Sequence, residues 1–203
     1  MLMEQEDRKP VIGLLGGSFN PVHIGHMMLA SYLAQWGYVD RVWLSLSPRS
    51  PLKDGDALLP DLKRLAMLTI AAKAAPLLDI CDIELSMPRP SYTINTLEVL
   101  RDRYPDLRFK LVIGSDNWRI FDRWRESQRI LDEFGVIVYL RHGYPVETRH
   151  VDGLEVVDAP IVNLSSTFVR DSIARGRDMS YFLPAGVYKY ICDNKLYRKT
   201  DDK

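Results

Sequence analysis

The chain has 203 residues, 46% of them hydrophobic, and its 27 basic residues balance 27 acidic ones. This length supports one well-buried core, so we expect a single domain over residues 1–203, with a core of about 11–197 and flexible tails at 1–9 and 199–203. The balanced charge argues against nucleic acid or an anionic membrane as a partner, and any anion site must therefore be local.

The first ten residues are acidic and polar, unlike a signal peptide, and no apolar run approaches the roughly 18 residues of a membrane span. We therefore expect a cytoplasmic protein without membrane contact. Cys81 and Cys192 lie far apart in the sequence, which argues against a disulfide framework or a local metal site and favours buried free thiols. Nothing in the sequence indicates an oligomeric state.

A strand, a tight turn and a helix start are predicted near the beginning of the chain. The apolar run 11–15 is followed by Gly16 and Gly17, and residues 27–36 continue as a helix. Unpaired N–H groups and the dipole at a helix start attract anions, and glycines allow close approach. His23 and His26, three residues apart, can lean toward the same phosphate. The alternative is an ordinary turn with two surface histidines.

The next segments alternate between strand and helix patterns. Residues 41–46 have strand composition and lead into a loop in which Arg49 and Lys53 are either phosphate ligands or solvated charges. Residues 62–72 repeat their apolar positions at helical intervals after Pro60 and Asp61, and are interpreted as scaffold. A strand is expected over residues 78–85.

A further helix opens at residues 91–100, with Tyr92 and Thr93 at its mouth, where hydroxyls can also serve only as caps. The buried strand 108–113 follows, and Asp116 comes directly after it. Ligands of open α/β sheets bind at the carboxyl ends of strands. Asp116 is therefore placed to accept hydrogen bonds from a ribose or to help hold Mg²⁺, unless it caps a helix beginning at Asn117.

The last third of the chain contains a second candidate anion site. Trp118, Phe121 and Trp124 form an aromatic stripe of the kind found in cores, and strands are expected at 135–141 and 154–157. The hydroxyls of residues 165–167 open the next helix, where Arg170 can reach a phosphate with a bidentate fork. A helix within 183–197 closes the chain.

Strands that alternate with helices predict an α/β fold with a doubly wound parallel sheet. The two candidate anion sites lie near opposite ends of the sequence. The fold must therefore bring residues 16–26 and 165–170 together at the carboxyl edge of the sheet.

Several motifs resemble those of one enzyme family. Residues 17–26 read Gly-Ser-Phe-Asn-Pro-x-His-x-Gly-His, which resembles the signature of the nucleotidyltransferases that share the H-x-G-H motif, and not a Walker P-loop. Residues 91–97, Ser-Tyr-Thr-x-x-Thr-Leu, and 164–170, Leu-Ser-Ser-Thr-x-x-Arg, are similar to elements of bacterial nicotinate-nucleotide adenylyltransferases. The resemblance covers most of residues 11–197. It implies a Rossmann-like fold with a C-terminal helical element, and adenylyl transfer from ATP to nicotinate mononucleotide that gives deamido-NAD and pyrophosphate, with Mg²⁺ bridging the phosphates.

The resemblance also implies roles for individual residues. The catalytic candidates are His23, His26, Lys53 and Arg170. The candidates for ATP binding are Gly16, Gly17, Ser18, Phe19, Gly25, Asp116, Ser165, Ser166 and Thr167. The candidates for mononucleotide binding are Asn20, Tyr92, Thr93, Trp124 and Arg141.

One position departs from the family pattern, because Arg125 follows Trp124 where relatives often have an aromatic residue. The preference for nicotinate over nicotinamide mononucleotide therefore stays open. Two other functions also stay open: a different adenylyl- or cytidylyltransferase, such as phosphopantetheine adenylyltransferase, and a non-catalytic nucleotide sensor on the same fold.

Overall fold

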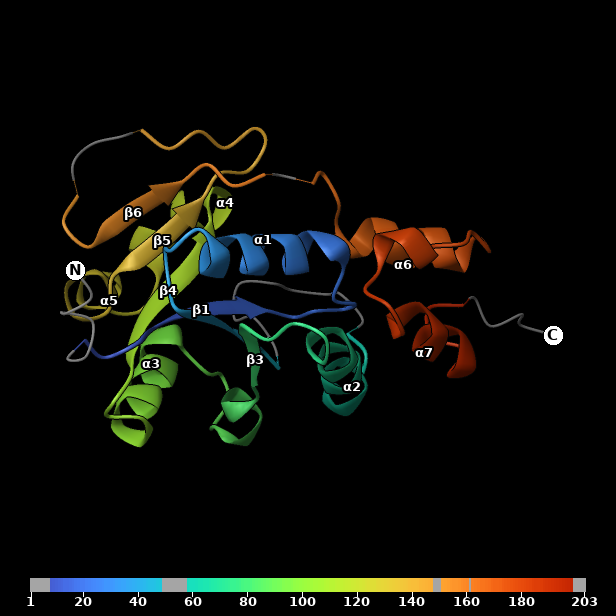
Figure 1. Cartoon of the computed structure of the whole chain (residues 1–203), viewed down its shortest axis with the longest axis horizontal. Coiled ribbons are helices and arrows are strands. Elements are labelled where there is room, and N and C mark those ends of the chain that lie inside the picture. Colours follow the sequence, from blue (N-terminus) through green and yellow to red (C-terminus); the bar gives the residue numbers. More distant parts are fainter. Residues whose placement is uncertain (1–7, 49–57, 148–150, 161, 199–203) are drawn as a thin grey trace, which may run out of the picture.

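The computed structural model describes residues 8–48, 58–147, 151–160 and 162–198. Six parallel strands form one sheet in the order β3-β2-β1-β4-β5-β6 (Figure 1). The strands are β1 (Val11–Gly17), β2 (Arg41–Leu46), β3 (Leu78–Cys81), β4 (Arg108–Gly114), β5 (Val136–Tyr139) and β6 (Leu154–Val157). The strand order reverses between β1 and β4, which is the switch point where such sheets bind ligands. The predicted doubly wound sheet is confirmed.

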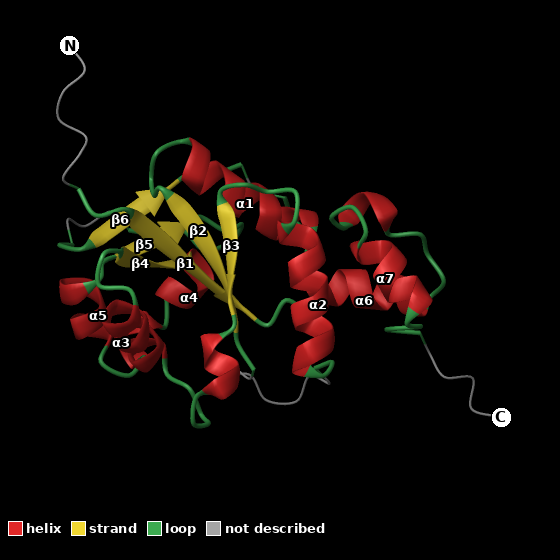
Figure 2. Cartoon of the chain, turned by 60° about the horizontal axis from the view of Figure 1, so that its bottom comes forward, coloured by secondary structure: helices red, strands yellow, loops and turns green. Residues whose placement is uncertain are grey.

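Helices cover both faces of the sheet. Figures 1 and 2 show α1 on one side and α3 and α5 on the other, with α2, α6 and α7 grouped beyond one end of the strands. The helices are α1 (Ile24–Gln35), α2 (Asp61–Ala72), α3 (Thr93–Arg103), α4 (Ser115–Trp118), α5 (Ser127–Glu133), α6 (Ser166–Ala174) and α7 (Val187–Asp193). Three short 3₁₀ helices are η1 (Ile83–Ser86), η2 (Phe121–Arg123) and η3 (Ser180–Phe182). Among the helices of the described residues, none is long and apolar enough to cross a membrane.

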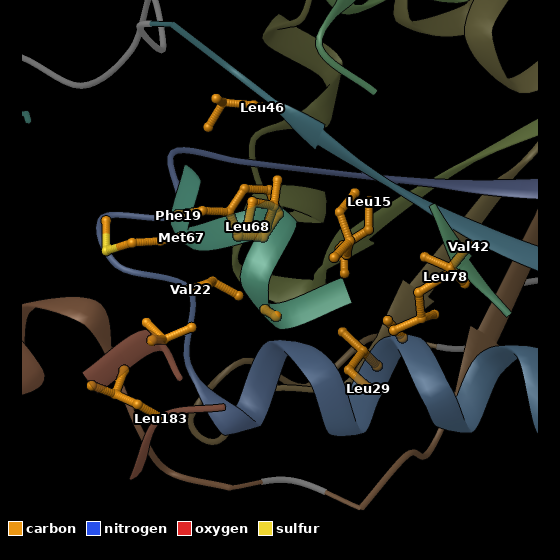
Figure 3. Packing of buried hydrophobic residues seen from close by; sticks show 14 of the residues in the cluster. Leu15, Phe19, Val22, Leu29, Val42, Leu46, Met67, Leu68, Leu78 and Leu183 are labelled. Atoms are coloured by element: carbon orange, nitrogen blue, oxygen red, sulfur yellow. The ribbon is translucent and has the colours of Figure 1, made fainter. Parts of the chain in front are cut away.

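The core consists of two hydrophobic clusters, one on each face of the sheet. Successive side chains of a strand point to opposite faces, so Val11 and Leu15 of β1 join one cluster while Ile12 and Leu14 join the other. The first cluster takes in α1, α2, α6 and α7, and the second takes in α3 and α5. Figure 3 shows Phe19, from the loop after β1, packed with residues of α2 in the first cluster. The same packing that stabilises the sheet therefore fixes the loop at its carboxyl edge.

The strand expected over residues 78–85 is wrong in its second half, because β3 ends at Cys81 and η1 follows. Two consecutive side chains, Ile83 and Glu84, are buried in this turn. The Glu84 carboxylate accepts hydrogen bonds from the hydroxyls of Ser45 at 3.3 Å and Ser91 at 3.1 Å. Its burial raises the pKa of Glu84 above the ordinary value.

The predictions of two buried free thiols and of flexible chain ends are met only in part among the described residues. Both thiols are free, but Cys192 is only half-buried whereas Cys81 is buried. The expected flexible segment 1–9 includes Arg8 and Lys9, which pair with Asp40 and with the carbonyl of Pro105 at the surface. The rest of the two predicted tails, residues 1–7 and 199–203, lies outside the described residues.

Candidate active site

The loop between β1 and α1 brings two histidines into contact. His23 is the N-cap of α1, and its backbone N–H donates to Nδ1 of His26 at 3.2 Å. The two imidazole rings stack with centroids 3.7 Å apart, and the edge of Phe19 meets the His26 ring at 5.1 Å. Because Nδ1 of His26 accepts this hydrogen bond, the hydrogen of the neutral ring belongs on Nε2. The pair is therefore held rigidly at a helix start.

His23 is kept neutral by its surroundings. Its side chain is 5% exposed, and in the described part of the chain its Nδ1 has no hydrogen-bond partner. Burial, and then the positive charge of Arg141, lower the pKa of His23 to about 4. A Cβ on Gly25 would lie 3.2 Å from Nδ1 of His23, so glycine leaves room for the ring. His23 can thus offer a hydrogen bond at neutral pH but not a charge.

The start of α6 lies against this loop, as predicted. The Ser166 hydroxyl donates to the carbonyl of Pro21 at 2.9 Å, and Nη1 of Arg170 donates to the carbonyl of Asn20 at 2.9 Å. These contacts join residues that are 145 and 150 positions apart in the sequence. The expected convergence of the two candidate anion sites is confirmed.

The hydroxyls at the start of α6 have partners within the protein. Ser165 Oγ accepts the N–H of Phe168 at 3.1 Å and so caps the helix, and Thr167 Oγ1 lies 3.2 Å from Nη2 of Arg170. A pyrophosphate would have to share or replace these bonds. The assignment of Ser165, Ser166, Thr167 and Arg170 to phosphate binding stays a prediction.

Two residues of the motif face inward instead of toward a ligand. Phe19 is 1% exposed, so only its backbone can meet a nucleotide. Asn20 is also 1% exposed, and its Oδ1 accepts hydrogen bonds from the Tyr197 hydroxyl at 2.8 Å and the Leu59 N–H at 3.5 Å. Burial raises the pKa of Tyr197, which keeps this donor protonated. The side chain ties the end of the chain to the loop, while its Nδ2 is buried without a hydrogen-bond partner among the described residues, and the contact of Asn20 with the mononucleotide stays a prediction.

Beside the switch point, an ion pair joins the segments that follow β4 and β5. Nη1 of Arg141 lies 2.7 Å from Oδ2 of Asp116, and the Arg141 N–H donates to the Ser115 hydroxyl at 2.9 Å. Asp116 lies inside α4 and does not cap a helix beginning at Asn117. A Cβ on Gly114 would lie 2.4 Å from Oδ1 of Asp116, so this pair requires glycine there.

Arg141 also lines a cleft of about 330 Å³. The other lining residues are Leu140, His142, Asp158 and Asn163. Oδ1 of Asp116 is buried and has no hydrogen-bond partner among the described residues. At the carboxyl edge of the sheet, this orphan acceptor is suited to a ligand hydroxyl.

The predicted mononucleotide residues Tyr92, Thr93 and Trp124 come from two neighbouring segments. Tyr92 is the N-cap of α3 and Thr93 its first residue, and no side chain caps this helix start. The guanidinium carbon of Arg125 lies 5.0 Å from the centroid of the Tyr92 ring, which places residues 124–125 beside α3. Trp124 packs on Phe121 at 5.5 Å and is half-buried against the second cluster. The fold brings these aromatic residues together.

Of the remaining predicted residues, Gly16 and Gly17 end β1. A Cβ built on Gly16 would have no atom of the described residues within 4 Å, apart from those of its chain neighbours. Lys53 and Arg49 lie outside the described residues, so their predicted roles stay predictions.

Sequence reasoning missed Arg64, which was interpreted as part of a scaffold helix. Its side chain is fully buried, and it donates to backbone carbonyls around the candidate site. A signal was present: Arg64, Met67, Leu68 and Ala71 have the i, i+3, i+4, i+7 spacing of the buried stripe of α2. An arginine in such a stripe needs buried acceptors, which points to backbone turns beside the helix.

Comparison with known proteins agrees with this geometry. The model of the family described as cytidylyltransferase-like matches residues 14–172. A protein of Bacteroides fragilis named "Probable nicotinate-nucleotide adenylyltransferase" is 45% identical over 184 residues, which span 90% of this chain and 92% of the relative. A relative of the same name from Porphyromonas gingivalis is 42% identical and aligns over 85% of this chain and 88% of its own length.

Solved structures share the fold. The nicotinic acid mononucleotide adenylyltransferase of Plasmodium falciparum, solved in complex with NaAD, superposes with a TM-score of 0.75 over 93% of this chain and 97% of its own, at 18% identity. The match of the family model over most of the chain, together with the identity to full-length relatives, establishes the family. The chain belongs to the cytidylyltransferase-like family and, within it, to the nicotinate-nucleotide adenylyltransferases.

Proposed function

We propose that this protein transfers the adenylyl group of ATP to nicotinate mononucleotide, giving deamido-NAD and pyrophosphate in the biosynthesis of NAD. The observation that carries the proposal is the convergence of the starts of α1 and α6, through the bonds of Ser166 to Pro21 and of Arg170 to Asn20. Two helix starts with histidine and arginine side chains make one site for a polyphosphate. The use of ATP also fits the cytoplasmic location expected from the sequence.

The reaction needs alignment more than acid–base chemistry. A 5′-phosphate oxygen of the mononucleotide attacks the α-phosphorus of ATP, a new P–O bond forms, and the bond to the bridging oxygen breaks to release pyrophosphate. The attacking phosphate is already ionised at neutral pH, so no side chain must remove a proton. The catalytic contribution is positioning and stabilisation of charge.

In this scheme the histidine pair binds the α-phosphate. Nε2 of His26 donates to a non-bridging oxygen, while the stacked ring of His23 keeps His26 in place and stays neutral. Arg170 and the hydroxyls of Ser165 and Ser166 hold the leaving pyrophosphate, together with Lys53. The pyrophosphate thus leaves from the α6 side of the loop.

We propose that Mg²⁺ enters with the triphosphate. The described residues contain no group of three or more His, Cys, Asp or Glu side chains that could hold a metal ion by themselves. Mg²⁺ is commonly bound by substrate phosphates and few protein ligands, and it neutralises phosphate charge when bound. Asp116 fits a ribose hydroxyl better than the ion, because Arg141 already places a positive charge 2.7 Å from its other oxygen.

The mononucleotide fits between α3 and residues 124–125. Trp124 and Tyr92 offer aromatic surfaces for the pyridine ring, and the uncapped start of α3 at Thr93 offers N–H groups to the nicotinate carboxylate. Arg125 lies over Tyr92 at the same place and adds positive charge. This arrangement favours the acid over the uncharged amide.

The test is an acceptor comparison with purified protein. ATP and Mg²⁺ are supplied with nicotinate mononucleotide, nicotinamide mononucleotide or phosphopantetheine, and both pyrophosphate and the adenylylated product are measured. We expect the highest kcat/KM with nicotinate mononucleotide. If phosphopantetheine is the only acceptor that reacts, the protein is a phosphopantetheine adenylyltransferase. If ATP binds but no acceptor reacts, the protein is a nucleotide sensor.

A further inference from the structure

Arg64 uses every one of its hydrogen-bond donors inside the protein. Its Nε donates to the carbonyl of Leu59 at 3.0 Å, and Nη1 donates to those of Ser18 at 2.5 Å and Ser47 at 3.0 Å. Nη2 donates to the carbonyl of Pro48 at 3.3 Å and to Oδ1 of Asp61 at 2.6 Å. Since a guanidinium has five N–H groups, all of them are paired.

Three of these acceptors belong to turns at the carboxyl ends of the adjacent strands β1 and β2. Ser18 follows β1, and Ser47 and Pro48 follow β2, where the Ser47 N–H also donates to the carbonyl of Gly17 at 3.0 Å. Leu59 precedes α2. Asp61 extends the network, because its second oxygen pairs with Arg89, in the segment before α3, at 2.8 Å. One buried cation therefore joins the loops around the candidate site.

Stability alone does not account for this residue. A buried ion pair recovers its desolvation penalty only with excellent geometry, and a well-packed apolar side chain of similar size is often as stable or more so. Arg64 occupies a position in the buried stripe of α2 where its neighbours are Met67 and Leu68. Its partners, however, are the carboxylate of Asp61 and four loop carbonyls, and not core atoms.

The orientation of one peptide links Arg64 to the site. In a planar trans peptide the C=O and the following N–H point in opposite directions. The Ser18 carbonyl points to Arg64, so the N–H of Phe19 points away from Arg64. Phe19 also has φ +42°, a left-handed conformation that is strained for an aromatic residue and persists only where its surroundings impose it.

We propose that Arg64 is a positioning residue that fixes the Ser18–Phe19 peptide so that the Phe19 N–H faces the triphosphate. This inference rests on the proposed function. Without the guanidinium, the Ser18 carbonyl loses its partner and the peptide can rotate, which removes one donor from the phosphate site. The effect should fall on ATP and on turnover, and not on the mononucleotide.

The test compares Arg64→Met and Arg64→Lys with wild type. Methionine keeps the length of the side chain but has no donors, and lysine has three donors for five acceptors. A displacement of about 1 Å in a reacting group can cost about 100-fold in rate. We therefore expect Arg64→Met to lower kcat/KM for ATP by about 100-fold, and Arg64→Lys to fall between Met and wild type. The KM for nicotinate mononucleotide should change less than about 3-fold.

Val136→Ala is the control for lost stability. Val136 is fully buried at the amino end of β5, on the opposite edge of the sheet from the loops. All variants are assayed at a temperature at which circular dichroism shows them folded. Equal losses of activity in Val136→Ala and Arg64→Met, or equal increases in the KM values for ATP and nicotinate mononucleotide, would overturn the proposal. If Arg64→Met does not fold, Arg64→Lys decides by the same criteria.

A binding measurement separates this proposal from the proposed function. A non-hydrolysable ATP analogue should slow hydrogen exchange at the Phe19 amide in wild type and not in Arg64→Lys. Wild type without turnover on any acceptor would refute the proposed function, while the exchange result still decides the role of Arg64. Equal protection of the Phe19 amide in both proteins would refute that role.

Discussion

Acid should destabilise this protein partly through a single histidine, His23. In the unfolded chain a histidine has a pKa of 6.5, whereas burial and the charge of Arg141 lower the pKa of the folded His23 to about 4. Between these values the unfolded chain binds a proton that the folded chain does not. The contribution of neutral His23 to stability is therefore fully present above pH 6.5 and is lost as the pH falls toward 4.

The two pKa values lie about 2.5 pH units apart, since 6.5 minus 4 is 2.5. One unit corresponds to about 1.4 kcal/mol, so the full effect is about 3 kcal/mol. The side chain is only 5% exposed, so solvent screens this effect little. A loss of this size is a large part of the 5–15 kcal/mol that stabilises a typical domain.

The assay is urea unfolding of wild type and His23→Gln at intervals from pH 4 to pH 7.5. Glutamine is polar and does not titrate, so the difference in unfolding free energy between the two proteins isolates His23 from the many carboxylates. That difference should change by about 3 kcal/mol across the range, with wild type losing more in acid. His142→Gln removes an exposed imidazole and serves as the matched control.

A difference between wild type and His23→Gln that stays constant from pH 7.5 to pH 4 would refute the reasoning. It would mean that His23 has the same pKa in the folded and the unfolded chain. The burial of His23 beside Arg141 would then be wrong. Arg141→Met distinguishes the two causes, because it removes the charge and leaves most of the burial. In that variant the pKa of the folded His23 should rise, so the loss of stability should still begin near pH 6.5 but be smaller and end at a higher pH.

Three further predictions concern catalysis and the core. His26→Ala should lower kcat by about 100- to 1,000-fold, as expected for the loss of one preorganised donor, and near-normal turnover would remove His26 from the mechanism. Trp124→Ala should raise the KM for nicotinate mononucleotide more than that for ATP, because stacking on an aromatic ring contributes about 1–3 kcal/mol; equal changes would assign Trp124 to the core. Glu84→Gln should be more stable than wild type at pH 8, because the raised pKa of the buried carboxyl lets the unfolded chain ionise first as the pH rises. Urea unfolding at pH 5 and pH 8 measures this gain, and its absence at pH 8 would contradict the burial of Glu84.

Much of the fold could be predicted from short-range patterns in the sequence. The apolar run of β1, the helix starts at His23 and Ser165, and the repeated strand–helix order are all short-range features. Parallel strands place their carboxyl ends at one edge, so the meeting of residues 16–26 with 165–170 followed from topology alone. The early end of β3 did not follow, because it depends on the burial of Glu84 between Ser45 and Ser91.

Side-chain direction within the site was less predictable than its location. Asn20 belongs to the motif, yet its partner is Tyr197, which lies 177 positions later, and no local pattern reveals such a bond. The low pKa of His23 likewise depends on its burial and then on Arg141, which follows β5, two strands away from β1 in the sheet. Long-range partners of this kind are fixed only when the chain is packed.

The buried groups around the loop also explain why its backbone can face a ligand. A phosphate site built from backbone N–H groups requires that the carbonyls of the same peptides point into the protein, where each needs a donor. Arg64 supplies this donor to the carbonyl of Ser18, whose peptide carries the N–H of Phe19. The carbonyls of Ser47 and Asn20 are bonded by Arg64 and Arg170, but their peptides continue with Pro48 and Pro21 and carry no N–H. Arginine suits this task because one side chain can serve several carbonyls that diverge from one another. The Ser18 carbonyl is thus paired inside the protein, and the Phe19 N–H is left to the side on which we propose that the triphosphate binds.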